Sequence, residues 1–314
     1  MVWHPKAVFV INFRYHVVSL TSVFLALAIG LVLGTAALNG PLLNNLNDRV
    51  SSLTKSKDQL RAQVGELESA VNQHGNYTRE LAPTVLDGKL RNKSVVLISV
   101  LGADSKDREG VINMLQVGGA RITGSLRLND RYLDPASDEV LHDLASRRVP
   151  AGVNLPNNGE GAVTASTVLA SVLTKPAIST DTRTTILQAF TELGMLTPEG
   201  KIDGTADSVV FLFGSASTKR DAGNKTKTAV TTVAAFSGVN SNVVAAAPSA
   251  GGGANPIAAL RSNGETKNTV STVDGLSRAE GQLGIAMALV QQYAGGSGHY
   301  GTGAGAVSQV PKIA

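Results

Sequence analysis

The longest uncharged apolar segment of the chain lies near its beginning, at residues 17–38. A helix of this length reaches about 33 Å, which matches the roughly 30 Å hydrocarbon core of a membrane. Basic but no acidic side chains precede the segment, and the first carboxylate of the chain is Asp48. By the positive-inside rule we expect a cytoplasmic N-terminus at residues 1–16, a transmembrane helix at 17–38 and an extracytoplasmic location for the remainder.

A cleaved signal peptide is the alternative interpretation of this segment. Thr35, Ala36 and Ala37 supply the small residues that a cleavage site needs. The apolar region of a signal peptide is typically about 7–15 residues long, however, and this one is longer. No later segment reaches the roughly 18 uncharged apolar residues that a spanning helix needs. The sequence therefore excludes a transporter built from several spanning helices.

Apolar residues between 42 and 82 recur at alternating spacings of three and four, which is the heptad pattern of a coiled coil. Valine predominates at one seam position and leucine at the other, with Lys57 as a polar residue in the seam. This composition favours a parallel two-stranded coil, so we predict a coiled-coil stalk at residues 42–82 and a homodimer. The alternative is one amphipathic helix that packs on its own domain. The predicted seam consists of Leu43, Leu46, Val50, Leu53, Lys57, Leu60, Val64, Leu67 and Val71.

An alternation of strand and helix patterns begins at Lys93 and continues to residue 293. Residues 94–100 form an unbroken apolar run, as expected of a parallel strand that is covered on both faces. Such units build a three-layer α/β domain through right-handed crossovers, so we expect a Rossmann-like or flavodoxin-like domain at residues 93–293. The other expected strands lie at 122–128, 208–213, 242–246 and 269–273. A helix is expected through Val117, and others at 136–147, 165–174, 182–193, 225–237, 256–261 and 278–293.

Sheets of this kind bind ligands at the carboxyl ends of their strands. The residues at these positions define a candidate pocket: Asp104, Ser105, Gly214, Ser215, Asp274 and Gly275. For Asp104 and Ser105 the alternative is a cap on the following helix. The first strand is not followed by a dinucleotide fingerprint, and P-loop, GxSxG and HExxH motifs are missing. We therefore expect no enzymatic activity, and an enzyme acting at this pocket is the least favoured alternative.

The amino-acid composition argues against several kinds of binding site. The chain has no cysteine, four isolated methionines and five histidines without ligand spacing, so no metal or cofactor site is evident. The net charge of +4 is small and aromatic residues make up 4%, which argues against a nucleic-acid partner. One stretch of the chain is rich in basic residues, and its simplest interpretation is a solvated loop. Its basic residues are Lys219, Arg220, Lys225 and Lys227.

The C-terminal segment at residues 294–314 is rich in glycine and poor in apolar residues, so we expect a loop or tail. Within it, a candidate interaction motif places an imidazole beside a phenol on a flexible backbone. The alternative to a free tail is that Tyr300 anchors the segment on the domain or on another protein. The motif is Gly298, His299, Tyr300 and Gly301.

The chain resembles the actinobacterial copper-transport protein MctB family. The likeness rests on the order of the parts and on four segments: 13–20 (FRYHVVSL), 23–30 (VFLALAIG), 32–34 (VLG) and 298–301 (GHYG). It implies a cell-envelope protein, a channel-type factor that contributes to copper efflux and keeps intracellular copper low. Relatives implicated in septum formation imply a second hypothesis, a dimeric coiled-coil scaffold that binds a division or cell-wall partner. Copper is implied by the resemblance alone, which supplies no liganding motif for residues of this chain.

Overall fold

The computed structural model describes residues 13–157 and 159–312, with side chains throughout that part except at residues 36–43. Most of the expected cytoplasmic N-terminus and the side chain of Leu43 in the predicted seam therefore lie outside the described residues. The chain divides into two compact units, the first ending at Val71 and the second beginning at Asn72. The second unit thus starts well before residue 93, the expected boundary of the α/β domain.

One continuous helix, α1 (Phe13–Leu86), is 74 residues long and crosses the boundary between the units. Its first part, Phe13–Thr35, has a mean hydropathy of 2.4 over its 18 most apolar consecutive residues, none of which is buried. Within the described residues, it is the one helix that is long and apolar enough to cross a membrane. This segment overlaps most of the transmembrane helix expected at 17–38.

The last turns of α1 belong to the core of the second unit. Thr78, Ala82 and Leu86 are 9%, 1% and 0% exposed. Ala82 and Leu86 belong to the same core cluster as side chains of α2 (Ser105–Val117) and α9 (Ala279–Tyr293). Their spacing of four residues places them on one face of the helix. The C-terminal end of α1 is therefore part of the α/β domain.

The α/β domain is built on a mostly parallel sheet whose strands follow the order β3-β2-β1-β4-β5-β6-β7. Within the described residues, β3 is the antiparallel strand, paired with β2, and the remaining neighbours pair in parallel. The strands are β1 (Ser94–Val100), β2 (Arg121–Leu128), β3 (Leu196–Pro198), β4 (Ser208–Phe213), β5 (Val243–Ala247), β6 (Ser271–Asp274) and β7 (His299–Tyr300).

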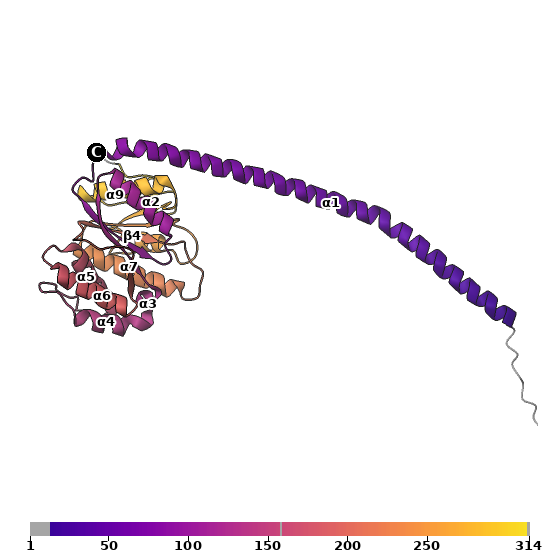
Figure 1. Ribbon diagram of the computed structural model, residues 1–314, viewed down its shortest axis with the longest axis horizontal. Coiled ribbons are helices and arrows are strands. Elements are labelled where there is room, and N and C mark those ends of the chain that lie inside the picture. The colour runs from indigo at the N-terminus through magenta and orange to yellow at the C-terminus, as the bar shows by residue number, and fades with distance from the viewer. Residues whose placement is uncertain (1–12, 158, 313–314) are drawn as a thin grey trace, which may run out of the picture. The chain divides into compact units, whose positions relative to one another are not determined.

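Helices cover both faces of the sheet, so the domain has three layers, as Figure 1 shows. In β1, Val95 and Leu97 pack toward α2 and α9, whereas Val96 and Ile98 pack toward the opposite layer. This alternation requires apolar side chains on both faces of the strand, which explains the apolar run from Val95 to Ile98. The opposite layer contains α3 (Asp130–Leu133), α4 (Asp138–Ser146), α5 (Gly161–Thr174), α6 (Thr180–Glu192) and α7 (Ala222–Val239). The short helices η1 (Pro135–Ser137) and α8 (Pro256–Ser262) complete the order.

The expected α/β fold is confirmed, and the structure adds elements that the sequence patterns did not predict. These are α3 and two very short edge strands, β3 and β7. The segment 294–314, which we expected to be a loop or tail, contributes β7 to the sheet. That expectation was therefore wrong at His299 and Tyr300.

The placement of α1 predicts two different effects for similar substitutions in one helix. Leu86→Ala should lower the free energy of unfolding of the α/β domain by about 2–5 kcal/mol, because it removes a fully buried side chain. Leu81→Ala is the matched control on the same helix, since Leu81 is 39% exposed and its loss should lower that free energy much less. Urea unfolding of the full chain in detergent, followed by the tyrosine signal in near-ultraviolet circular dichroism, measures both. Equal effects of the two substitutions would contradict this packing.

Candidate functional site

The order of the strands reverses direction between β1 and β4, which is where α/β sheets form ligand crevices at the carboxyl ends of their strands. Leu101 and Gly102 follow β1 with positive φ angles of 51° and 74°. Gly214 follows β4 and packs against them so closely that a Cβ atom would lie 2.3 Å from the Leu101 carbonyl oxygen. Glycine at this position therefore lets the two strand ends meet.

A cavity of about 170 Å³ opens beside these strand ends. Leu101, Gly102 and Ser215 contribute to its wall from the loops after β1 and β4. The polar residues that complete the wall come from the loop before α7, from α7 itself and from α3: Asp130, Ser217, Lys219, Asp221, Lys225 and Thr226. Of the six strand-end residues in the predicted pocket, Ser215 is the one that lines this cavity.

Lys225 forms the electrostatic centre of the cavity wall. Its Nζ lies 2.7 Å from Asp221 Oδ2 and 2.9 Å from Asp130 Oδ2, and its side chain is 18% exposed. The hydrogen bond to Asp221, followed by the one to Asp130, raises the pKa of Lys225. The hydrogen bond between Lys225 and Asp221 also lowers the pKa of Asp221. The lysine is thus held in its charged form between two carboxylates.

Asp104 and Ser105 begin α2 and lie outside this cavity. The Asp104 carboxylate accepts a hydrogen bond from the Lys106 backbone N–H at 2.7 Å and caps the helix. This contact supports the capping alternative for Asp104. The two residues do not meet the other predicted pocket residues in the cavity.

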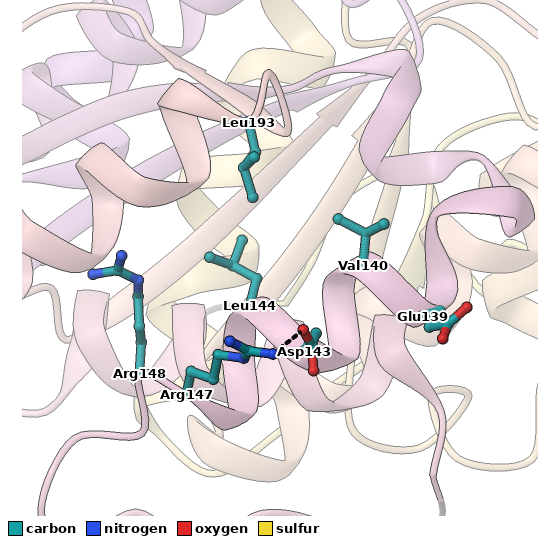
Figure 2. Close-up of a pocket in the computed structure, with 7 residues that line it drawn as sticks. All are labelled: Glu139, Val140, Asp143, Leu144, Arg147, Arg148 and Leu193. Carbon is teal, nitrogen blue, oxygen red and sulfur yellow. Dashed lines mark ion pairs between the residues drawn. The ribbon is translucent and has the colours of Figure 1, made fainter.

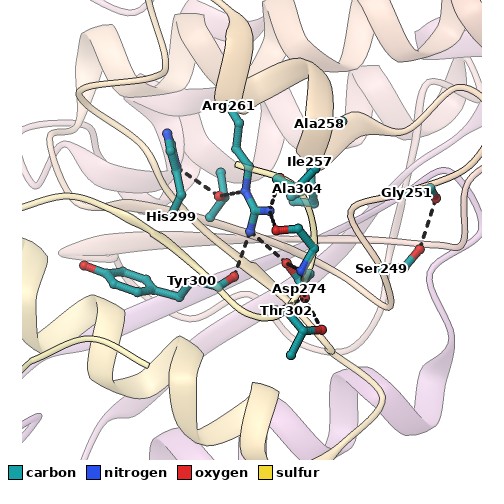
Figure 3. Close-up of polar contacts among 12 residues, drawn as sticks. Ser249, Gly251, Ile257, Ala258, Arg261, Asp274, His299, Tyr300, Thr302 and Ala304 are labelled. Carbon is teal, nitrogen blue, oxygen red and sulfur yellow. Dashed lines mark hydrogen bonds and ion pairs between the residues drawn. The ribbon is translucent and has the colours of Figure 1, made fainter. Parts of the chain in front are cut away.

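Asp274 belongs to a second polar centre, shown in Figure 3, whereas Gly275 donates its backbone N–H to the Pro248 carbonyl at 3.2 Å. Asp274 is 4% exposed, and its Oδ2 lies 3.0 Å from Nη2 of the buried Arg261. Its carboxylate also accepts hydrogen bonds from the backbone N–H groups of Thr302 at 2.8 Å and Gly303 at 3.1 Å. Asp274 therefore holds the C-terminal segment.

Arg261 contacts the same C-terminal segment from the other side. Its guanidinium donates to the Tyr300 carbonyl at 2.7 Å and the Ala304 carbonyl at 2.8 Å. Nε donates to Thr272 Oγ1 at 2.9 Å, and this hydroxyl lies 3.0 Å from His299 Nδ1. The Thr272 hydroxyl either donates to His299 Nδ1 or accepts from it, depending on the tautomer of the ring. We call Arg261, Asp274, Thr272 and His299 the C-terminal clamp.

The glycines of the candidate interaction motif are explained by this clamp. Gly301 has a φ of 123°, and a Cβ atom there would lie 2.2 Å from Asp274 Cγ. A Cβ atom at Gly298 would lie 2.3 Å from Tyr300 Oη. Tyr300 is 3% exposed and donates a hydrogen bond to Gln291 Oε1. The motif thus anchors the segment on its own domain, which was the alternative to a free tail.

A third polar group, which the sequence patterns did not predict, surrounds Glu199. Its carboxylate lies 2.8 Å from Arg108 Nη1 and 2.6 Å from Arg127 Nη2, and its side chain is 10% exposed. Ser99 of β1 also donates to it at 2.9 Å. The polar Ser99, which follows the apolar run Val95–Ile98 in β1, was the signal in the sequence. The cluster ties the segment after β3 to β1, β2 and α2.

The outer surface of α4 carries an open hollow of about 740 Å³. Figure 2 shows Val140, Leu144 and Leu193 directed toward it. Charged side chains surround these apolar residues, and Arg147 Nη2 pairs with Asp143 Oδ2 at 2.7 Å. Val140 and Leu193 are 38% and 37% exposed, so apolar surface remains accessible here.

The side chains of α1 form the last candidate site. The apolar residues of the predicted seam from Leu46 to Val71 are each more than half exposed. Four of them line an apolar groove along the helix together with Lys57, the polar residue of the seam: Val50, Leu53, Leu60 and Val64. Among the described residues, no group of three or more His, Cys, Asp or Glu side chains is arranged to hold a metal ion.

Nearly the whole chain matches one protein family. The family model described as "Copper transport outer membrane protein, MctB" matches residues 10–311. The chain belongs to the MctB family. Proteins named Copper transporter MctB from Mycobacterium tuberculosis (strain ATCC 25618 / H37Rv) and Mycobacterium bovis (strain ATCC BAA-935 / AF2122/97) are 30% identical to it, over 95% of this chain and 98% of theirs. A protein of the same name from Mycobacterium leprae (strain TN) is 28% identical over the same shares.

The clamp of this MctB-family chain predicts a stability that depends on pH through His299. Burial lowers the pKa of His299, and the positive charge of Arg261 lowers it further. A hydrogen bond with the Lys267 backbone raises this pKa but does not cancel the two larger effects. The folded state therefore binds this proton less readily than the unfolded state, whose histidine pKa is about 6.5. The contribution of His299 to stability is complete above about pH 6.5 and decreases as the pH falls from there toward the folded pKa.

Unfolding of the full chain in urea at a series of pH values tests this prediction. His299→Gln should weaken the dependence on pH in this range, because glutamine does not titrate. His74→Gln is the matched control, since His74 is exposed on α1. Identical pH profiles for the wild type and His299→Gln would show that His299 does not contribute.

Proposed function

We propose that the protein is a membrane-anchored homodimer that contributes to copper efflux and so keeps intracellular copper low. The observation that carries this proposal is the exposed apolar seam on α1, which follows the apolar segment Phe13–Thr35 on the same continuous helix. Membership in a copper-transport family supplies the biological context. The proposal gives the α/β domain a binding role and no catalytic step.

Pairing of two α1 helices accounts for the exposed seam. Large apolar patches on soluble surfaces mark interaction sites, and burying one Leu or Val side chain contributes about 1.5–3 kcal/mol. Two chains anchored in one membrane run in the same direction, as the valine and leucine positions of the seam favour. The occupant of the groove in this proposal is therefore the α1 helix of a second copy.

The packing of the α/β domain sets a limit to this pairing. The heptad pattern continues from Val71 to Thr78 at the same seam position, but Thr78 is 9% exposed because it packs on its own domain. A side chain covered in this way is not available to a second helix. We therefore propose that the paired region ends near Val71, before the end of the stalk expected at residues 42–82.

The orientation in the membrane is the second element of the proposal. Arg14 and His16 flank the start of the apolar segment, while the first carboxylate is Asp48. This asymmetry favours a cytoplasmic N-terminus and an extracytoplasmic α/β domain. In that arrangement the domain acts in the cell envelope, where copper leaving the cell arrives.

Disulfide trapping tests the dimer directly, because the native chain has no cysteine. Val50→Cys should give a covalent dimer when membranes containing the full chain are treated with diamide. In a parallel, in-register coil these seam positions face each other within the roughly 4.4–6.8 Å between Cα atoms that a disulfide requires. Non-reducing gel electrophoresis measures the dimer fraction.

Lys55→Cys is the matched control for this experiment. Lys55 lies on the same exposed helix but on the side opposite the seam, so it should remain largely monomeric. Equal crosslinking of the two variants would indicate random collision. Absence of crosslinking at Val50→Cys would argue against a parallel, in-register pair.

The copper role predicts a change in total cellular copper. Deleting the protein in its own host should raise copper per cell, measured by elemental analysis after growth in copper-supplemented medium. The wild-type chain should restore the low level, whereas a chain with Leu53→Asp and Leu60→Asp should restore it poorly, because charges in the seam oppose pairing. The matched control carries Ser52→Asp and Lys55→Asp, outside the seam. Unchanged copper in the deletion strain would exclude the efflux role.

A scaffold that binds a division or cell-wall protein is the second candidate function. The hollow on α4 supports it, because Val140 and Leu193 leave apolar surface accessible within a charged rim. The same deletion experiment separates the two functions. A scaffold role leaves copper unchanged, and a photo-crosslinker at Val140 should then capture one division or cell-wall protein that a crosslinker at Val117, an exposed valine of α2 in the other helical layer, does not.

A further inference from the structure

We infer that a pocket between α6 and the end of β3 binds a small molecule that carries a carboxylate on an apolar remainder, and that Arg183 pairs with this carboxylate. The inference rests on a buried positive charge without a negative partner among the described residues, on the apolar surface beside it and on the size of the pocket. The site lies within one α/β domain, so the inference depends neither on the copper role nor on the dimer.

The pocket is large enough for a small organic molecule. Its volume is about 310 Å³, at the lower end of the roughly 300–1,000 Å³ of small-molecule sites. Arg183 and Leu187 line it from α6, and Pro198 and Ile202 line it from β3 and the segment that follows. Leu187, Pro198 and Ile202 give the pocket an apolar surface, which suits the apolar part of a ligand.

Arg183 brings a buried positive charge to this wall. The residue is 5% exposed, and its Nε and Nη2 donate to the carbonyls of Val172 at 2.9 Å and Ile178 at 3.1 Å. Burial lowers the pKa of Arg183, and no carboxylate of the described residues raises it again. Arginine nevertheless remains protonated in proteins, and it is rarely buried without a charged partner. The domain therefore holds a charge that its own described side chains leave unpaired.

The free part of the guanidinium is Nη1. Within the described residues this atom makes no hydrogen bond, and unlike Nη1 of Arg108 it is not fully covered by protein. It therefore keeps accessible surface on a side chain that is otherwise enclosed. Because Arg183 belongs to the pocket wall, we assign this surface to the pocket, where a ligand reaches the charge.

The hydroxyl groups of the wall leave the guanidinium as the main donor to a ligand. Thr184 and Thr191 donate their protons to the carbonyls of Thr180 at 2.9 Å and Leu187 at 2.8 Å in the same helix. A threonine has one hydroxyl proton, so neither residue has a proton left for a ligand. Charge-assisted hydrogen bonds from a guanidinium are roughly twice as strong as neutral ones.

The charge of the wall selects a carboxylate among the common anions. Arg183 is the one charged residue among the described residues of the wall. A carboxylate carries one negative charge and neutralises it, whereas a phosphate monoester carries about 1.5 to 2 negative charges at neutral pH. A monocarboxylate with an apolar remainder therefore matches both the charge and the apolar surface.

The test compares hexanoate with its neutral analogue hexanamide, by isothermal titration calorimetry on the full chain in lipid nanodiscs. Empty nanodiscs give the background heat. Hexanoate should bind saturably and about tenfold more tightly than hexanamide, which is the effect of one hydrogen bond between charged groups.

Thr184→Glu places a competing carboxylate in the wall and should weaken hexanoate binding about tenfold. Thr185→Glu is the matched control, because Thr185 is the next exposed residue of the same helix and lies outside the wall. It should change the affinity less than about twofold, as expected of a screened surface charge.

Arg183→Gln separates a ligand role from a structural role. This variant also loses the hydrogen bonds to Val172 and Ile178, so the measured quantity is the ratio of the hexanoate and hexanamide affinities, which should fall to about one. A structural role alone would leave this ratio unchanged, and Thr184→Glu tests the site without removing the arginine.

Absence of saturable hexanoate binding, equal wild-type affinities for the two probes, or equal losses in Thr184→Glu and Thr185→Glu overturns the inference. None of these results bears on the crosslinking or cellular copper experiments.

Discussion

The pattern of apolar side chains on the helix α1 changes along its length, and the position of each pattern is the main constraint on the first part of the chain. Apolar side chains cover its whole circumference at Phe13–Thr35, form one stripe from Leu46 to Val71, and then move to the face that contains Ala82 and Leu86. The first pattern suits lipid, the second a partner helix and the third a protein core. The helix is continuous, and its C-terminal end packs in the core of the α/β domain.

The C-terminal clamp contains a buried ion pair, which is stable only when its remaining hydrogen-bonding groups have partners. Arg261 and Asp274 have side chains that are 4% and 3% exposed, and removing one partner of such a pair typically costs about 3–5 kcal/mol. The pair is stable because the backbone of Tyr300, Thr302, Gly303 and Ala304 satisfies its remaining donors and acceptors. The glycine-rich segment is thus required by the core, since larger residues would not fit around the carboxylate.

The sequence was sufficient for elements whose signal is local. Strands β1 and β4 have the predicted bounds, because their apolar runs are continuous and end at glycine-containing turns. The strands β3 and β7 consist of three and two residues, too few for a pattern, and they form because a neighbouring strand offers an edge. Asp274 was placed in the candidate pocket for a similar reason: its partners in the C-terminal segment lie far beyond any local pattern.

The same reasoning explains why the basic stretch at Lys219–Lys227 looked like a solvated loop. Its charges have no periodicity, and their relation to Gly102 and Asp130 depends on the strand order of the sheet, which places the ends of β1 and β4 side by side. The cavity is lined by residues of the α/β domain, and the groove of the seam is lined by residues of α1. A substitution in the seam therefore changes no residue of the cavity, and a substitution at Lys225 changes no residue of the seam.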